Sequence, residues 1–157
     1  PAAAVPYIPE HVHGNWRWFL NFGSGMTGDW GVHMIDIALL AMGPDTRLPM
    51  PTEVSAHGGK LAWPDDDRTA PDTHLALMRF RDPDFVLHWE TGRKPVDLDV
   101  DHGTQFIAAD GKTLTVWRGG WRVQNAAGDD LPLVDAPPVP NSHMADFLDG
   151  VRNRRQT

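Results

Sequence analysis

The chain has 157 residues, a length that suits one domain with a real hydrophobic core. Its formal net charge of -7 argues against a nucleic-acid partner and against an anionic membrane surface, because both favour basic proteins. The absence of cysteine excludes disulfides, thiolate catalysis and thiolate metal sites, and it leaves a cytoplasmic and an exported protein equally open.

The N-terminal part predicts a loop-rich lead-in followed by one helix. Pro and His dominate the start, an aromatic stretch covers 15–22, a glycine loop covers 23–28, and a helix is expected over 29–42, where a Gly-Pro pair ends it. The start has neither a basic segment nor a long apolar one, so it does not predict a signal peptide. No apolar run is long enough to span a membrane.

The apolar period changes to two after Pro51, which predicts strands. Short turns such as Asp110-Gly111 and Gly119-Gly120 are typical of hairpins, so neighbouring strands should be antiparallel. The expected strands are 53–58, 73–81, 85–91, 103–109, 112–118 and 121–125.

A proline-rich linker, 136–140, precedes a last expected helix over 142–153, whose apolar stripe includes Phe147 and Val151. These elements predict an α+β domain, an open and mostly antiparallel sheet with helices packed on one face. We expect residues 1–157 to form a single domain. The start without Met, and the end directly after a helical pattern, lead us to expect a fragment of a larger protein.

The helix over 29–42 carries a polar stripe on otherwise apolar faces. Asp29, His33 and Asp36 lie at steps of four and three, which places them in line, and the apolar residues on the other faces predict a helix buried nearly all round. One explanation is structural: Asp29 caps the helix and accepts a bond from His33. The other is an acid–base couple in which the aspartate fixes the histidine tautomer and raises its basicity. Spacing alone leaves both open.

Gly23, Gly25 and Gly28 match the G-x-G-x-x-G pattern of nucleotide-binding turns. The context argues against such a turn, because a dinucleotide fold needs a strand directly after the helix, ending in an acidic residue. Here prolines follow the helix, and Asp45 falls in that loop. We therefore interpret the glycines as a loop that lets a substrate approach the start of the helix.

The combination of Asn15–Phe22, the glycine loop and Asp29-Trp30-Gly31-Val32-His33-Met34-Ile35-Asp36 resembles the C-terminal domain of the Gfo/Idh/MocA oxidoreductases. That family includes glucose–fructose oxidoreductase and inositol dehydrogenase. Weaker similarities extend the resemblance over nearly the whole chain: Pro71-Asp72-Thr73, Phe85–Glu90, Gly103–Gly111 and His143–Arg154.

The resemblance implies a fold like the C-terminal domain of glyceraldehyde-3-phosphate dehydrogenase and a catalytic role for His33, which takes a hydroxyl proton while Asp29 positions or relays. It implies hydride transfer between NAD or NADP and a hydroxyl carbon of a sugar or polyol, and a homo-oligomer formed through the open sheet. The family's N-terminal Rossmann domain is missing, and so is its Glu-Lys-Pro element, since Lys94-Pro95 follows Arg93. We therefore expect this fragment alone to bind no NAD(P) and to be inactive.

Three residues just ahead of Asp29 are candidates for substrate binding: Trp16, Arg17 and Asn21. An aromatic face stacks on a sugar, and a guanidinium holds hydroxyls, carboxylates or phosphates. Core packing with a structural ion pair is the alternative. The remaining tryptophans near strands are expected on sheet faces or interfaces: Trp63, Trp89, Trp117 and Trp121.

Two other functions stay open. His11 and His13 could join His33 and Asp29 as ligands of a metal-assisted hydrolase. A non-catalytic binding or oligomerisation module is the third possibility. The acidic run 65–67 is most simply a solvated loop.

Overall fold

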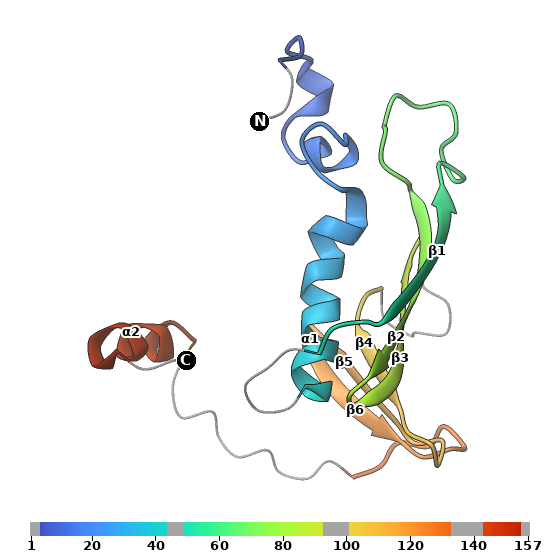
Figure 1. Ribbon diagram of the computed structural model, residues 1–157, viewed down its shortest axis with the longest axis vertical. Helices are drawn as coiled ribbons and strands as arrows, with labels where there is room; N and C mark the ends of the chain where they lie inside the picture. Colours follow the sequence, from blue (N-terminus) through green and yellow to red (C-terminus); the bar gives the residue numbers. More distant parts are fainter. Residues whose placement is uncertain (1–3, 44–48, 93–100, 133–142, 155–157) are drawn as a thin grey trace.

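The structure is a computed structural model that describes residues 4–43, 49–92, 101–132 and 143–154 (Figure 1). The proline-rich linker 136–140 and the Lys94-Pro95 pair lie outside the described residues.

The strands form two antiparallel three-stranded sheets. The first sheet has the order β1 (Glu53–Gly59), β2 (Thr73–Arg81) and β3 (Asp84–Thr91). The second has the order β4 (Thr104–Ile107), β5 (Thr113–Trp117) and β6 (Gly120–Gln124). All six expected strands are present, and the α+β class is confirmed, with the strands divided between two sheets in the part of the chain that the structure describes.

The turns that the sequence predicted close these hairpins. Gly111 adopts a φ of 82°, which an L side chain rarely tolerates, and the Lys112 amide donates to the Asp110 carboxylate at 3.1 Å. The Ala108 amide donates to the Lys112 carbonyl across the same turn at 2.9 Å. Local turn chemistry therefore fixes the register of β4 and β5.

The helical part begins with two short 3-10 helices, η1 (Pro9–His11) and η2 (Asn15–Trp18). A π-helical turn, η3 (Thr27–Gly31), then runs directly into α1 (Val32–Met42). The helix starts earlier than predicted, at Gly25, so Gly28 lies inside a helical turn and not in a loop.

The core lies between α1 and one face of the first sheet (Figure 1). Alternate residues of β2 and β3 point toward the helix, as the strand period requires. Phe80 is 1% exposed and stacks on Phe85 with ring centroids 4.3 Å apart. The buried cluster consists of Ala38, Ala76, Phe80, Leu87 and Trp89.

The prediction that α1 is buried nearly all round is wrong. Ala38 is its only buried residue, whereas Val32 is 52% and Leu40 is 74% exposed. His33 and Asp36 are exposed too. The helix has one face on the sheet, and nothing in the described part of the chain covers the opposite face, although that face includes the apolar residues Val32 and Leu40.

The last helix, α2 (His143–Asn153), is confirmed within one residue of its expected start. Its apolar stripe is exposed and makes no contribution to the buried core of the described residues. The stripe consists of Met144, Phe147, Leu148 and Val151.

We expect Gly58→Ala to destabilise the first sheet by about 1–3 kcal/mol. A Cβ at Gly58 lies 2.4 Å from the Thr73 carbonyl oxygen, so the backbone of β2 would have to move. Gly59→Ala is the matched control, because its Cβ meets nothing closer than 3.7 Å. Urea unfolding of the two variants measures the difference. Equal unfolding midpoints would show that β2 moves away from the new Cβ with little loss of folding free energy.

Candidate active site

The polar stripe lies at the start of the long helix, but its members are not paired as predicted. Asp29 belongs to the π-helical turn η3, and His33 and Asp36 belong to α1. No hydrogen bond or ion pair joins Asp29 to His33, and among the described residues His33 has no such partner at all. Both explanations offered by the sequence assumed a bond between Asp29 and His33, and the structure contradicts that bond.

Arg17 forms an ion pair with the Asp29 carboxylate instead. Its Nε lies 2.5 Å from Asp29 Oδ2, with the two side chains 31% and 24% exposed. The contact is an ion pair without hydrogen-bond geometry at Nε, which has no hydrogen-bond acceptor in the described structure. A second guanidinium nitrogen donates to the Gly14 carbonyl at 2.8 Å. The guanidinium therefore connects η2 to the start of the helix that carries His33.

The predicted substrate-binding residues are distributed around this ion pair. Trp16 is 43% exposed, and the guanidinium of Arg17 lies 5.7 Å from its ring centroid. Gly23 allows close packing here, because a Cβ would come within 3.0 Å of Arg17 Cα and 3.2 Å of the Trp16 ring. Asn21 is exposed, and no contact of its side chain with Trp16 or Arg17 is observed. The structure brings Trp16, Arg17 and Asp29 together and leaves Asn21 outside this contact.

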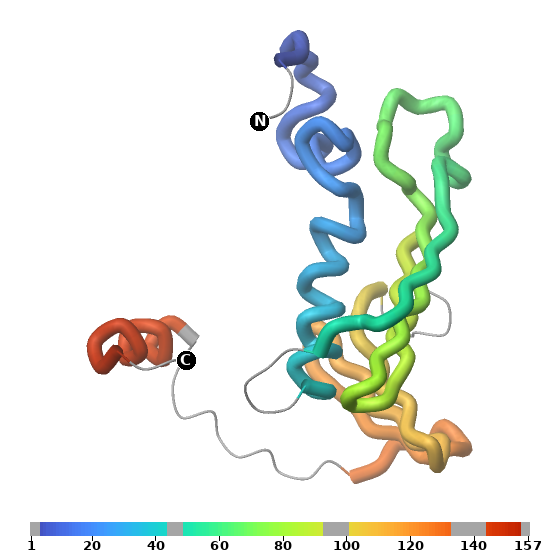
Figure 2. Tube along the Cα trace, in the orientation of Figure 1, coloured from blue at the N-terminus to red at the C-terminus, as the bar shows by residue number. Residues whose placement is uncertain are grey.

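The loop between β1 and β2 holds the N-terminal segment in place (Figure 2). The backbone amides of Thr69 and Ala70 donate to the Trp18 carbonyl at 3.0 and 2.8 Å. The Leu20 amide donates to the Thr69 hydroxyl at 2.8 Å. This loop thereby fixes the segment that contains Trp16 and Arg17.

Arg68 adds a cation–π contact between the same two segments. Its guanidinium lies 5.2 Å from the Trp18 ring centroid and 4.7 Å from the Trp63 ring centroid. Asp66 pairs with this guanidinium and with Lys60. Arginine stacks well on aromatic rings because its planar cation is weakly hydrated.

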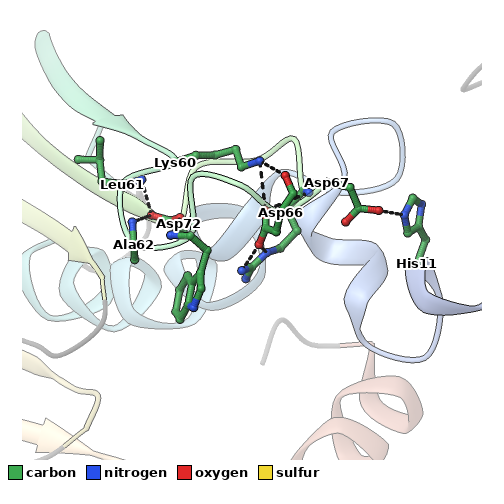
Figure 3. Close-up of polar contacts among 9 residues, drawn as sticks. His11, Lys60, Leu61, Ala62, Asp66, Asp67 and Asp72 are labelled. Atoms are coloured by element: carbon green, nitrogen blue, oxygen red, sulfur yellow. Dashed lines mark hydrogen bonds and ion pairs between the residues drawn. The ribbon is translucent and has the colours of Figure 1, made fainter.

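Residues 65–67 lie in a partly exposed loop, as expected, but two of the three aspartates make ion pairs that the sequence did not predict. Asp66 has the ion pairs just described, and Asp67 Oδ2 lies 2.5 Å from His11 Nε2 (Figure 3). His11 also stacks on Phe19, with centroids 3.8 Å apart. The structure thus uses His11 to attach the loop, and no group of three metal-ligating side chains occurs among the described residues. The metal-ligand set predicted from His11, His13, His33 and Asp29 does not assemble.

Asp72 closes the loop from its C-terminal end (Figure 3). It is 5% exposed and accepts hydrogen bonds from the backbone amides of Leu61, Ala62 and Trp63, each at 3.0 Å, and from the Thr73 hydroxyl at 2.9 Å. Burial by itself raises the pKa of this carboxyl, but the three amides and the hydroxyl outweigh it and hold the pKa at about 2.

A polar contact between the helix start and the first sheet was not predicted from the sequence. The Trp89 indole N–H donates to Thr27 Oγ1 at 3.0 Å, and the same hydroxyl lies 2.9 Å from His74 Nδ1. Thr27 lies two residues before Asp29, so this contact anchors the turn that carries the polar stripe.

Comparison with known proteins identifies one family. The model of the family described as GFO/IDH/MocA C-terminal domain matches residues 5–94, more than half of the chain, and covers every element from η1 to β3. No curated protein matches the chain. No helix of the described residues is long and apolar enough to cross a membrane.

Proposed function

The chain belongs to the GFO/IDH/MocA C-terminal domain family, and we propose that it is the substrate-side half of an oxidoreductase that transfers hydride between NAD(P) and a hydroxyl carbon of a sugar or polyol. The observation that carries the proposal is the position of His33. It is an exposed imidazole with no partner among the described residues, four positions after Asp29, whose carboxylate pairs with Arg17 beside the exposed Trp16.

The imidazole of His33 suits removal of a hydroxyl proton. Imidazole is the group that enzymes most often use to accept a proton, and a proton acceptor must lie within hydrogen-bond reach of the proton that it takes. Because no side chain in the described structure occupies its ring nitrogens, either nitrogen is available to a bound hydroxyl. The proton released when the alcohol carbon is oxidised would pass to His33.

Asp29 and Arg17 have a different role from the one that the spacing suggested. The carboxylate holds the guanidinium, which is itself attached to the Gly14 carbonyl. The guanidinium thus has a fixed position beside the exposed face of Trp16. An arginine and an aromatic face in contact are suited to a polyhydroxylated substrate, because the ring stacks on C–H groups and the cation donates to hydroxyls.

The residues of this chain do not fit a dinucleotide. The residues before Gly23 include a 3-10 helix and no strand, and Gly28 lies in a π-helical turn, so no nucleotide-binding turn is formed. NAD(P), when bound, supplies the hydride acceptor, and we propose that a separate Rossmann domain holds it. The exposed apolar residues Val32 and Leu40 flank His33 on the helix face that such a domain would cover.

The outer face of the first sheet supports the proposal of a homo-oligomer. Leu75, Leu77 and Val86 are 39%, 44% and 57% exposed on that face. Charged pairs surround them, including Arg81 with Glu53 at 2.8 Å. An apolar centre with a polar rim is typical of a protein–protein interface.

The test compares two proteins. The full-length polypeptide that contains this chain should reduce NAD+ or NADP+ with at least one member of a panel of polyols and aldoses, followed by the absorbance of the reduced nicotinamide. The isolated chain, once circular dichroism shows that it is folded, should release no heat on titration with either nucleotide. Nucleotide binding by the folded isolated chain contradicts the assignment of the cofactor to another domain, and a full-length protein inactive on the whole panel contradicts the substrate class.

A further inference from the structure

One hydroxyl joins the start of the helix that carries His33 to two strands of the first sheet. Thr27 Oγ1 lies 3.0 Å from Trp89 Nε1 on β3 and 2.9 Å from His74 Nδ1 on β2. All three side chains are partly or fully buried.

The chemistry of the three groups allows one hydroxyl to satisfy both neighbours. An indole N–H can only donate, so Thr27 Oγ1 accepts from Trp89. The hydroxyl has one proton and a second lone pair, so it pairs with His74 Nδ1 in either tautomer of the imidazole.

A second contact holds the same helical turn against the same tryptophan. A Cβ at Gly31 would lie 3.2 Å from Trp89 Cζ2, so the backbone of η3 packs directly on the indole. Thr27 and Gly31 lie on either side of Asp29 in the sequence, and both contact Trp89. The turn that carries Asp29 is therefore held at two points on one indole. Because this turn continues directly into α1, the same contacts position the first turn of α1, which carries His33.

We propose that Thr27 is a positioning residue for the reaction proposed above. It touches neither the substrate nor His33. It fixes the rotation of the helix start about its own axis, and this rotation decides where the His33 ring and the Arg17–Asp29 pair point. The inference rests on the proposed function, because it gives Thr27 a role only through His33. Displacement of a catalytic group by about 1 Å can lower a rate about 100-fold, so a single hydrogen-bonded anchor matters.

The test uses the full-length protein and the polyol or aldose that it oxidises fastest. Thr27→Val keeps the shape of the side chain and removes both hydrogen bonds, so we expect kcat to fall about 10- to 100-fold with a smaller change in KM. Thr27→Ser keeps the hydroxyl and should restore kcat to within about threefold of the wild type, on the same reasoning.

Thr52→Val is the matched control. The Thr52 hydroxyl donates to the Arg79 carbonyl at 3.1 Å, so this variant also removes a threonine hydroxyl contact, but within the first sheet and not at the helix. Equal losses of kcat in Thr27→Val and Thr52→Val, or a serine variant as slow as the valine variant, would overturn the proposal.

A spectroscopic measurement separates this inference from the proposed function. In ¹⁵N-labelled protein, Thr27→Val should shift the backbone amides of Asp29 and His33, whereas Thr52→Val should leave them in place. Unshifted Asp29 and His33 amides in Thr27→Val overturn the inference even in an active enzyme. A protein inactive on every substrate that still shows these shifts would contradict the proposed function while supporting the anchor.

Discussion

Replacement of His33 by glutamine in the full-length protein is expected to lower kcat by about 10²–10⁴-fold while the affinity for NAD(P) stays unchanged. Glutamine fills similar space and can still hydrogen-bond a substrate hydroxyl, but it cannot accept its proton. Since His33 is exposed and makes no hydrogen bond in the described structure, the change removes no stabilising contact and should leave the unfolding midpoint in place. Steady-state kinetics and nucleotide titration measure the two quantities.

His57→Gln is the control for a general effect of losing a histidine. His57 is also exposed, and it pairs with Leu75 on the outer face of the first sheet, opposite to the helix. Its replacement should leave kcat within about twofold of the wild type, because His57 lies on the sheet face away from the helix, and size-exclusion chromatography checks that the oligomeric state proposed for this face is unchanged. A His33→Gln enzyme that keeps full kcat would exclude His33 as the proton acceptor. It would favour the alternative in which this domain serves binding or oligomerisation and takes no part in catalysis.

The strands could be predicted closely because their signals are local. Alternation of side chains across a strand and the turn residues between strands act over a few positions, so β2 was expected over the same residues that the structure shows. The division into two sheets has no such local signal. It depends on which strand edges meet in space, and neither the alternation nor the turns carry that information.

The polar stripe shows where a local rule fails. Helical spacing placed Asp29 four residues from His33 and therefore predicted a bond between them. The π-helical turn η3 changes the winding at this point, and Arg17, twelve positions upstream, competes for the carboxylate with a permanent positive charge. Helical spacing identified the polar residues of this stripe, but it did not predict their partners.

The contacts of the loop between β1 and β2 were not predicted for the same reason. Its contacts reach back to Trp18 and His11, about fifty positions earlier in the chain. An acidic run and a tryptophan are each ordinary on a surface, so composition favoured a solvated loop. Only the fold shows that Arg68 lies close to the rings of both Trp18 and Trp63, and that the loop hydrogen-bonds the segment that contains Trp16 and Arg17.

Asp72→Asn is expected to destabilise the protein by about 2–4 kcal/mol at neutral pH. The buried carboxylate accepts from three backbone amides, and its second oxygen receives the Trp63 amide. An asparagine turns its NH2 group toward at least one of these donors, so a buried N–H loses its acceptor. The other donors then bond to a neutral amide oxygen and no longer to a charged carboxylate. Asp65→Asn is the matched control, because Asp65 lies exposed in the same loop with no hydrogen bond in the described structure.

The pH dependence identifies the charge as the cause. Folding lowers the pKa of Asp72 from its ordinary 3.8 to about 2, so the carboxylate contributes about 2 kcal/mol of stability that is fully present above about pH 4 and is lost as the pH falls toward 2. Urea midpoints measured across this window should fall steeply in the wild type and in Asp65→Asn, and more gently in Asp72→Asn. Parallel curves for all three proteins would show that another carboxylate is responsible.

The same substitution connects the loop to catalysis. Asp72 fixes one end of the segment whose Thr69 and Ala70 amides hold the Trp18 carbonyl, and Trp18 directly follows Arg17. If Trp16 and Arg17 bind the substrate, loosening this loop should raise KM at neutral pH more than it lowers kcat, because the proposed proton acceptor His33 lies on α1, to which the loop makes no hydrogen bond among the described residues. The opposite pattern, a fall in kcat at constant KM, would place the loop in contact with the reacting groups.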